Sequence, residues 1–200
     1  RVWSAASPLP FFLPRSIAVV GASRSPSNIG TRILRAIVSA GFKGSVYPVN
    51  PKADAIAKLK AYPSIRELPE TPDLAVVAVP ANAIDSVIDD CGERNVHAVI
   101  VITAGFAEVG VEGREHQNKL LEKIRGYGMR MVGPNCMGLL NADPAVRLNA
   151  SFSPVFPPPG RLGMSSQSGA LGLAILGLAV ERHLGLSTFV SVGNKADVSS

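Results

Sequence analysis

The chain has 200 residues, a hydrophobic share of 46% and a formal net charge of +5, which is typical of a folded protein with a real core and excludes a disordered one. Its basic residues are scattered rather than clustered, so they are typical of ordinary surface and argue against a nucleic-acid-binding protein. The two cysteines, Cys91 and Cys136, lie far apart, which argues against a disulfide scaffold and a zinc site and favours a reducing, cytoplasmic location.

Five short apolar runs, rich in β-branched residues, follow an irregular lead-in that contains three prolines within residues 1–14. The runs do not alternate cleanly between apolar and polar residues, which is typical of strands buried on both faces. They occupy residues 17–20, 45–49, 74–79, 98–102 and 129–132.

Amphipathic helical patterns separate these runs, over residues 29–40, 83–94 and 113–127. A further short helix is expected between residues 51 and 68. Strands that alternate with helices imply right-handed crossovers and a parallel sheet, so we expect a Rossmann-like α/β domain. Ligands of such sheets bind beyond the carboxyl ends of the strands.

Gly, Pro, Ser, Thr and Asn fill nearly every one of these strand exits. They occur at residues 21–23, 50–52, 80–82, 103–105 and 133–136. This concentration of small and turn-forming residues predicts the ligand site.

Four prolines within residues 153–160 predict a linker. Beyond it, residues 161–164 predict a strand, residues 170–183 an apolar helix and residues 188–192 another strand. The helix is apolar nearly all round, so we expect it to be buried, and its apolar stretch is too short to span a membrane. A second α/β domain therefore begins here, and we expect the chain to be a fragment of a longer protein.

The turn after the first strand, residues 21–30, has the composition of a phosphate-binding loop. Gly21 permits close approach of the backbone to a phosphate, and the following helix directs free N–H groups at the anion. Ser23, Ser25, Ser27 and Asn28 supply further donors. The spacing is not that of the dinucleotide fingerprint, and a capped structural loop is the alternative.

The exit of the second strand distinguishes between nucleotides. NAD-binding domains place an acidic residue here for the ribose hydroxyls, whereas this chain has Asn50, Pro51 and Lys52. A cation at this place suits a ribose phosphate, as in NADP or in the 3′-phosphate of coenzyme A (CoA). An ordinary surface lysine is the alternative.

Two later segments are weaker candidates. Cys136 can serve as a nucleophile, but a small lining residue near a thioester or plain core packing is favoured. The serines and Gly169 at residues 165–169 open the apolar helix, whose start can stabilise an anion or can be only a structural cap. The three histidines, which are expected to be structural or solvated, are His97, His116 and His183.

Six motifs in this order resemble the nucleotide-diphosphate-forming acyl-CoA synthetases, the family of succinyl-CoA synthetase α subunits and ADP-forming acetate–CoA ligases. The resemblance covers nearly everything from about residue 12 to residue 200. The motifs are VGAS at residues 20–23, YPVNPK at 47–52, VPA at 79–81, ITAGF at 102–106, GPNCMG at 133–138 and SQSG at 166–169.

The resemblance implies a Rossmann-like CoA-binding domain over residues 12–148, a proline-rich linker over 149–160 and the incomplete start of a flavodoxin-like ligase domain over 161–200. It implies that Ser166, Ser168 and Gly169 support a phosphohistidine, although none of the chain's histidines matches that residue. The cofactor-binding residues it implies are Gly21, Ser23, Ser25, Asn50, Pro51, Lys52, Val79, Pro80, Ala81, Thr103, Ala104, Gly105, Asn135 and Cys136.

The family interconverts acyl-CoA, ADP and phosphate with carboxylic acid, ATP and CoA, through an acyl phosphate and a phosphohistidine. The resemblance implies a small acid such as acetate as substrate, an ATP-grasp subunit or domain that binds ADP or ATP with Mg, and an oligomeric parent enzyme. The chain alone is expected to bind CoA without turnover. Two alternatives stay open: a CoA-sensing region of a protein lysine acetyltransferase or regulator, and an NADP-dependent reductase.

Overall fold

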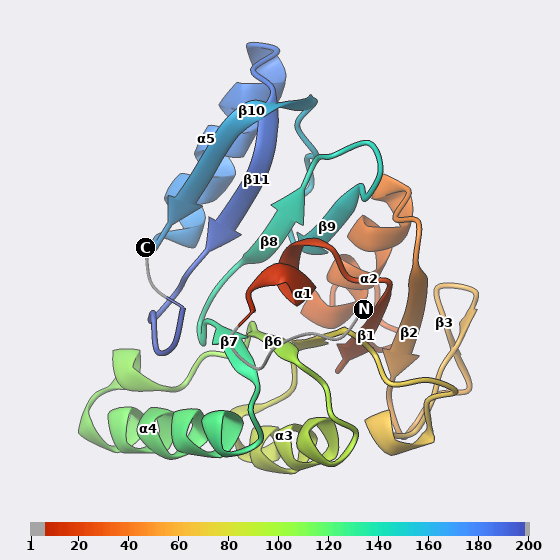
Figure 1. Cartoon of the computed structure of the whole chain (residues 1–200), viewed down its shortest axis with the longest axis vertical. Coiled ribbons are helices and arrows are strands. Elements are labelled where there is room, and N and C mark those ends of the chain that lie inside the picture. The colour runs from red at the N-terminus through yellow and green to blue at the C-terminus, as the bar shows by residue number, and fades with distance from the viewer. Residues whose placement is uncertain (1–6, 199–200) are drawn as a thin grey trace.

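Five parallel strands form the main sheet of the computed structural model, which describes residues 7–198 (Figure 1). Their order is β2-β1-β5-β6-β7, and all four pairings are parallel. The predicted parallel sheet is therefore confirmed. The strands are β1 (Ser16–Val20), β2 (Ser45–Val49), β5 (Leu74–Val77), β6 (Ala98–Val101) and β7 (Arg130–Val132).

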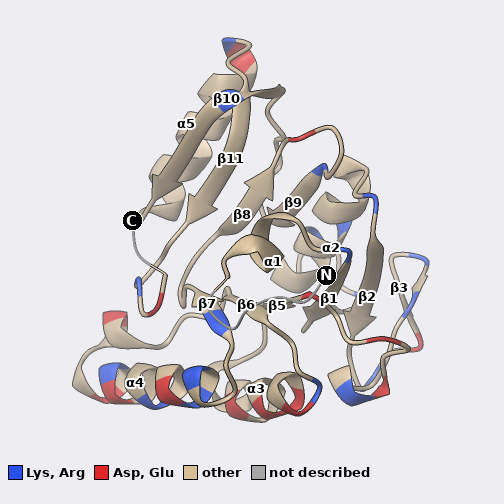
Figure 2. Cartoon of the chain, viewed as in Figure 1, with Lys and Arg blue, Asp and Glu red and all other residues tan. Residues whose placement is uncertain are grey.

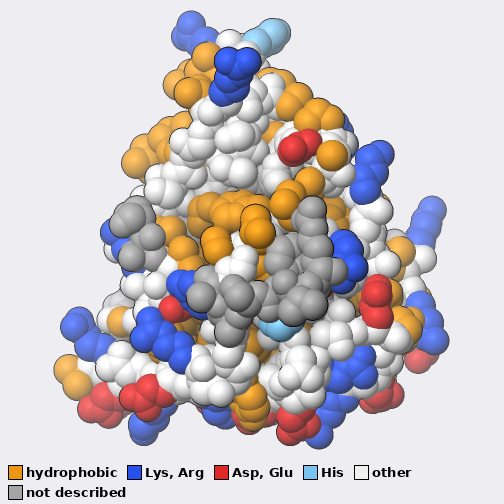
Figure 3. All heavy atoms as spheres, in the orientation of Figure 1, with side chains coloured by type: hydrophobic (Ala, Val, Ile, Leu, Met, Phe, Trp, Pro, Cys, Tyr) orange, Lys and Arg blue, Asp and Glu red, His pale blue; other side chains and the backbone are white. Residues whose placement is uncertain are grey.

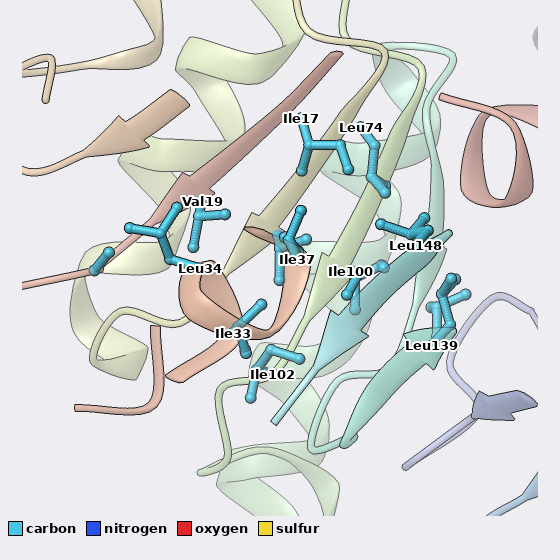
Figure 4. Close-up of a cluster of buried hydrophobic side chains, with 14 of the residues drawn as sticks. Ile17, Val19, Ile33, Leu34, Ile37, Leu74, Ile100, Ile102, Leu139 and Leu148 are labelled. Carbon is cyan, nitrogen blue, oxygen red and sulfur yellow. The ribbon is translucent and has the colours of Figure 1, made fainter. Parts of the chain in front are cut away.

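Alternate residues of the central strands enter two different cores, which explains why these strands read as continuous apolar runs. Ile17 and Val19 of β1 pack with α2 (Ile29–Ala40), as Figure 4 shows. Ala18 and Val20 pack on the opposite face with α3 (Ile84–Glu93) and α4 (Val111–Gly126). The bounds of α2 are those that the sequence predicts, and α3 and α4 lie within two residues of theirs.

A second, mixed sheet stands beside the first, in the order β10-β11-β8-β9. It consists of β8 (Gly138–Asn141), β9 (Leu148–Ser151), β10 (Pro159–Ser166) and β11 (Leu186–Ser191). β10 and β11 are parallel, whereas β8 pairs antiparallel with both β11 and β9. The sequence analysis missed β8 and β9, and the expected boundary between residues 148 and 149 falls inside β9.

The helix α2 is packed between the two sheets. Its Ile33, Leu34 and Ile37 are fully buried in one cluster that also holds Leu139 of β8 and Leu148 of β9 (Figure 4). One helix thus joins the apolar faces of both sheets, so the two sheets share a core.

Several short elements differ from the sequence predictions. A four-residue helix, α1 (Leu9–Phe12), lies in the lead-in that was expected to be irregular, and it buries Phe11. The hairpin of β3 (Ala55–Ile56) and β4 (Leu59–Lys60) was not expected. The short helix expected between residues 51 and 68 is the 3₁₀ helix η1 (Ile65–Glu67). Two more 3₁₀ turns are η2 (Ala81–Ala83) and η3 (Ala107–Val109).

The helix α5 (Gly169–Glu181) is not buried as its composition suggested, because one side packs on β10 and β11 and the other reaches the surface. Leu171 is 55% exposed and Leu178 47%, and hydrophobic side chains are visible along this edge in Figure 3. Charged side chains concentrate instead on α3 and α4 (Figure 2). Among residues 7–198, no helix is long and apolar enough to cross a membrane.

The loop after β11 fastens the second sheet to the first. The Asp197 side chain is 3% exposed and accepts hydrogen bonds from Arg130 Nε at 2.8 Å and from the Met131 backbone N–H at 2.9 Å. Arg125 Nη2 donates to the same carboxylate at 3.0 Å. Burial alone would raise the pKa of Asp197, but these hydrogen bonds outweigh burial and hold the pKa below its usual value.

Replacing Asp197 with Asn should lower the free energy of unfolding by about 2 kcal/mol at pH 7, because a buried carboxylate that accepts hydrogen bonds from three residues loses its charge. A carboxyl group whose pKa is lower in the folded chain than in the unfolded chain stabilises the fold at pH values above its unfolded pKa. This stabilisation is lost as the pH falls through the folded pKa. The deficit of Asp197→Asn, measured by urea denaturation, should therefore shrink below about pH 4. A deficit that is constant across this range, or one equally large in the exposed control Glu115→Gln, contradicts the assignment.

Candidate functional site

A cleft opens where β1 and β5 end, at the point where the strand order reverses. Starting from β1, the chain extends the sheet to β2 on one side and to β5, β6 and β7 on the other. Loops separate at such a reversal, which makes it the usual ligand site of an open parallel sheet. Two adjoining cavities, of 580 and 670 Å³, lie here and share Asn28, Ala78, Val79 and Pro80. Each is of the size that small-molecule sites have, and together they form one cleft.

Gly21 ends β1 at the middle of this cleft with φ +94°. A Cβ atom on Gly21 would lie 2.3 Å from the Ala78 carbonyl oxygen. Both the left-handed backbone and the missing space require glycine here. The backbone of β1 can therefore turn sharply and lie directly against β5.

Hydrogen bonds hold the loop that follows Gly21 in one shape. Asn28 caps α2 by accepting from the Thr31 N–H at 3.0 Å. Thr31 Oγ1 accepts from the Ser23 N–H at 2.8 Å and donates to the Ser23 carbonyl at 2.7 Å. Asn50 Nδ2 donates to the Ala22 carbonyl at 2.7 Å, which ties the exit of β2 to this loop. The start of a 12-residue helix and a fixed loop thus face the cleft, an arrangement that suits an anion.

Lys52 lies at one end of the cleft. Its backbone N–H donates to Asn50 Oδ1 at 2.8 Å, which fixes the main chain, and its side chain is exposed. No carboxylate among residues 7–198 pairs with its ammonium group. The one acidic residue that lines this cavity, Asp90, is paired with Arg66 Nε at 2.6 Å. This end of the cleft therefore offers a free positive charge.

The other end of the cleft surrounds Cys136. The thiol is buried, its Sγ donates to the Val101 carbonyl at 3.3 Å, and burial raises its pKa to about 12. A thiol with that pKa stays protonated at neutral pH, so the geometry favours a lining role over a nucleophilic one. Thr103 is fixed beside it by donating to the Val79 carbonyl at 2.7 Å.

The start of α5 reaches the same end of the cleft from the second sheet. Gly169 and Gln167 line the cavity around Cys136. Ser168 caps the helix by accepting from the Leu171 N–H at 3.2 Å, and Ser166 Oγ donates to the Ser168 carbonyl at 2.9 Å. The two serines therefore shape the helix start, and only its glycine and Gln167 face the cavity.

The cleft brings together most of the residues that the sequence singled out. Those lining it are Gly21, Ser23, Asn50, Pro51, Lys52, Val79, Pro80, Ala81, Thr103, Ala104, Asn135, Cys136 and Gly169. Ser25, Gly105, Ser166 and Ser168 do not line it. Ser25 Oγ is instead exposed and bonded to Ser27 Oγ, and the Gly105 N–H donates to Glu108 Oε1.

Sequence reasoning missed part of the lining. Met137 and Phe152 close the cavity around Cys136, and Ser64 and Ser86 line the one around Lys52. Phe152 lies next to the proline-rich segment, which the sequence predicts to be a linker. No local sequence pattern predicts that Phe152 lines the cavity. The two serines lie in ordinary helix and loop patterns, so only the folded chain could reveal them.

Comparison with known families gives two matches in sequence order. The family described as "CoA binding domain" matches residues 15–142. The family described as "Succinyl-CoA ligase like flavodoxin domain" matches residues 159–200. The first match contains the loop after Gly21 and the Cys136 segment, and the second contains the start of α5.

Curated relatives agree with these matches. The chain is 44% identical over 191 residues to the acetate–CoA ligase (ADP-forming) I subunit α of Pyrococcus furiosus, covering 94% of this chain and 41% of that protein. It is 40% identical over 190 residues to the 4-hydroxybutyrate–CoA ligase (ADP-forming) of Nitrosopumilus maritimus, covering 95% of this chain and 27% of that protein. The chain thus spans less than half the length of the relatives it matches.

A solved structure supports the fold. Acetyl-coenzyme A synthetase 1 of Ca. Korarchaeum cryptofilum, in complex with phosphate and ADP, superposes with a TM-score of 0.90 at 49% identity. The match covers 95% of this chain and 40% of that one.

Replacing Gly21 with Ala should lower the free energy of unfolding by about 3 kcal/mol, because the methyl group meets the Ala78 carbonyl and the backbone is left-handed. Gly110→Ala is the matched control, since Gly110 has φ +117° and a Cβ atom added there would meet nothing within 4 Å. It should cost about 1 kcal/mol, the conformational part alone. Urea denaturation measures both, and equal losses would show that the close approach at Gly21 is not tight.

Proposed function

Because the chain belongs to the family of CoA-binding domains, we propose that it is the CoA-binding part of an ADP-forming acyl-CoA synthetase. The observation that carries this proposal is the single cleft that runs from the free Lys52 ammonium, past the loop of Gly21, to Cys136 and the start of α5. Such a cleft suits a long ligand that is anionic along one part and carries its reactive group at the far end.

Three parts of CoA meet three different groups of residues in the cleft. Lys52 meets the 3′-phosphate, because its ammonium has no other partner in the described chain. The start of α2 holds the pyrophosphate through its first free backbone N–H groups, beside the loop of Gly21 and Ser23. Thr103, Asn135 and Cys136 surround the far end, where CoA supplies the thiol that carries the acyl group.

The shape and lining of the cleft support this assignment in addition to the family match. The missing Cβ atom of Gly21 lets the backbone pack on the Ala78 carbonyl, which supports the sharp turn into the loop that we propose to bind the pyrophosphate. The 670 Å³ cavity around Cys136 is lined largely by small or apolar residues and the Thr103 hydroxyl, as a pantetheine arm with its few amides requires. A protonated Cys136 thiol adds no charge beside the ligand's sulfur.

The second sheet brings an anion-binding element to the reacting end. Gly169, at the start of α5, lines the cavity around Cys136, and the N-terminus of a 13-residue helix stabilises negative charge. This arrangement supports a role in steadying a phosphorylated intermediate beside the thiol, in line with the resemblance to the synthetases. Neither His97, His116 nor His183 lines the cleft, so we expect the phosphorylated histidine to be supplied by the longer protein.

The acid substrate is proposed to be a small carboxylic acid such as acetate, as in the acetate–CoA ligase relative. The 4-hydroxybutyrate–CoA ligase relative is nearly as similar, so the acid is chosen outside the shared CoA cleft. We further propose an ATP-grasp domain or subunit for ADP and Mg, an oligomeric parent enzyme and a cytoplasmic location, which the two free, buried cysteines favour.

Calorimetric titration with CoA, dephospho-CoA and NADP tests the proposal. CoA should bind, and Lys52→Ala should weaken CoA about tenfold because one charge-assisted contact is lost, equivalent to about 1.4 kcal/mol. Dephospho-CoA should bind the native chain and Lys52→Ala alike. Lys58→Ala, an exposed lysine in the nearby hairpin, is the control and should leave CoA affinity unchanged.

One result would overturn this proposal, and a second would contradict only the role of Lys52. Binding of NADP without binding of CoA would place the chain among reductases. An equal effect of Lys52→Ala on CoA and dephospho-CoA would remove Lys52 from the 3′-phosphate while leaving the cleft itself assigned.

A further inference from the structure

A third cavity, of 440 Å³, lies between α2, β9 and the segment that follows β9. On α2, Arg32, Arg35 and Ser39 face it, at the spacing that places residues on one side of a helix. This side is opposite to the one formed by Ile33 and Ile37 in the core. Of the residues that line this cavity, only Phe152 also lines the cleft described above, so the cavity is a separate place on the molecule.

The cavity is strongly positive. Arg32, Arg35 and Arg147 line it, and no Asp or Glu does. None of the three arginines forms an ion pair within residues 7–198. α2 contains no acidic residue either (Figure 2). Three uncompensated guanidinium groups around one hollow repel one another, and an anion bound between them would relieve this repulsion.

Two of these arginines are held in place while keeping donors free. Arg147 Nε donates to the Ala40 carbonyl at 2.6 Å, and its guanidinium lies 5.8 Å from the Phe156 ring centroid. Arg32 Nη2 donates to the Phe152 carbonyl at 3.0 Å, and its guanidinium lies 5.6 Å from that residue's ring. A guanidinium has five N–H donors, so most remain available. Held guanidiniums lose little conformational freedom when an anion binds.

A buried amide supports the same reading independently. Asn149 of β9 is only 4% exposed and lines this cavity. Its Oδ1 accepts from Ser151 Oγ at 2.6 Å, but its Nδ2 group has no hydrogen-bond partner within residues 7–198. Among residues 7–198, the only fully enclosed side-chain nitrogen or oxygen atom without a hydrogen-bond partner is Arg94 Nε. The Asn149 amide therefore is not sealed in the core and opens into the cavity as a donor without an acceptor.

We propose that this cavity is a second anion-binding site, distinct from the CoA cleft, for a small organic molecule with a phosphate or carboxylate group. The anion accepts from Arg35, from the free N–H groups of Arg32 and Arg147 and from Asn149 Nδ2. The apolar part of the ligand lies against Phe152, Phe156 and the neighbouring prolines. The volume suits a ligand of the size of a phenyl phosphate or a larger ester.

The test is a titration of the ¹⁵N-labelled chain with phenyl phosphate, benzoate and phenol, followed through the Asn149 side-chain amide resonance. Phenyl phosphate, benzoate or both should shift this resonance saturably, and phenol should not, because it carries no anion at pH 7. A response to one anion alone identifies the site as one for organic phosphates or for organic acids. The titration is run with and without CoA, so its result does not depend on the CoA cleft being occupied.

Arg35→Glu is the decisive variant, because Arg35 is exposed and has no partner in the described chain, so the fold should be kept. It should weaken the anion at least about tenfold, whereas Arg114→Glu, an equal charge change on the exposed face of α4, should have little effect. Unchanged urea midpoints would verify that both variants fold. The proposal is overturned if neither anion moves the Asn149 amide, or if Arg35→Glu and Arg114→Glu weaken the anion equally.

Discussion

The packing of α2 between two sheets is the constraint on which the rest of the structure depends. Its apolar face closes the core of the parallel sheet, and the same cluster contains Leu139 and Leu148 of the second sheet. A helix buried in this way cannot shift along its axis without opening both cores. Its first turn, and therefore the loop after Gly21, is fixed by hydrophobic packing well away from the ligand.

Close backbone contact completes this placement. A Cβ atom on Gly30, in the first turn of α2, would lie 2.7 Å from the Ala22 nitrogen, so the helix start and the loop touch without an intervening side chain. Asn50 then links the loop to the exit of β2 through the Ala22 carbonyl. This end of the cleft is rigid because three strand exits and one helix are joined by glycine contacts and short hydrogen bonds rather than by flexible side chains.

The Cys136 end of the cleft depends on the second sheet in the same manner. The loop after β11 returns to the first sheet, where Asn194 Nδ2 donates to Glu108 Oε2 at 2.6 Å and to Gln117 Oε1 at 2.9 Å. Glu108 also accepts from the Gly105 N–H. Asn135 Nδ2 also donates to Asn194 Oδ1 at 3.3 Å, which links the loop after β11 to the Cys136 segment. Residues of both matched families line the cavity around Cys136. The hydrogen bond to Glu108 also explains why Gly105, although in the ITAGF motif, shapes the cleft without lining it.

The sequence by itself determined the parallel sheet, the three helices that cover it and most of the cleft. Buried strands are apolar, and the helices that cover them have an apolar face. The exits of parallel strands meet at one edge of the sheet. Local composition and the order of the elements therefore suffice to predict these features. The missing acid and the presence of Lys52 at the second strand exit predict a ligand with a ribose phosphate, which both NADP and CoA carry, and the role of Lys52 stays a prediction.

Only the tertiary structure decided that β8 and β9 join the two predicted strands, β10 and β11, in one sheet, that one side of α5 is exposed and that a positive cavity lies beside α2. β8 and β9 are short and contain no β-branched residue, and β8 becomes a strand by pairing with β11, about 50 residues later. Arg32, Arg35, Arg147 and Asn149 come from segments more than 100 residues apart in the chain. No local pattern can show that such residues converge, because their proximity results from α2 packing against β9.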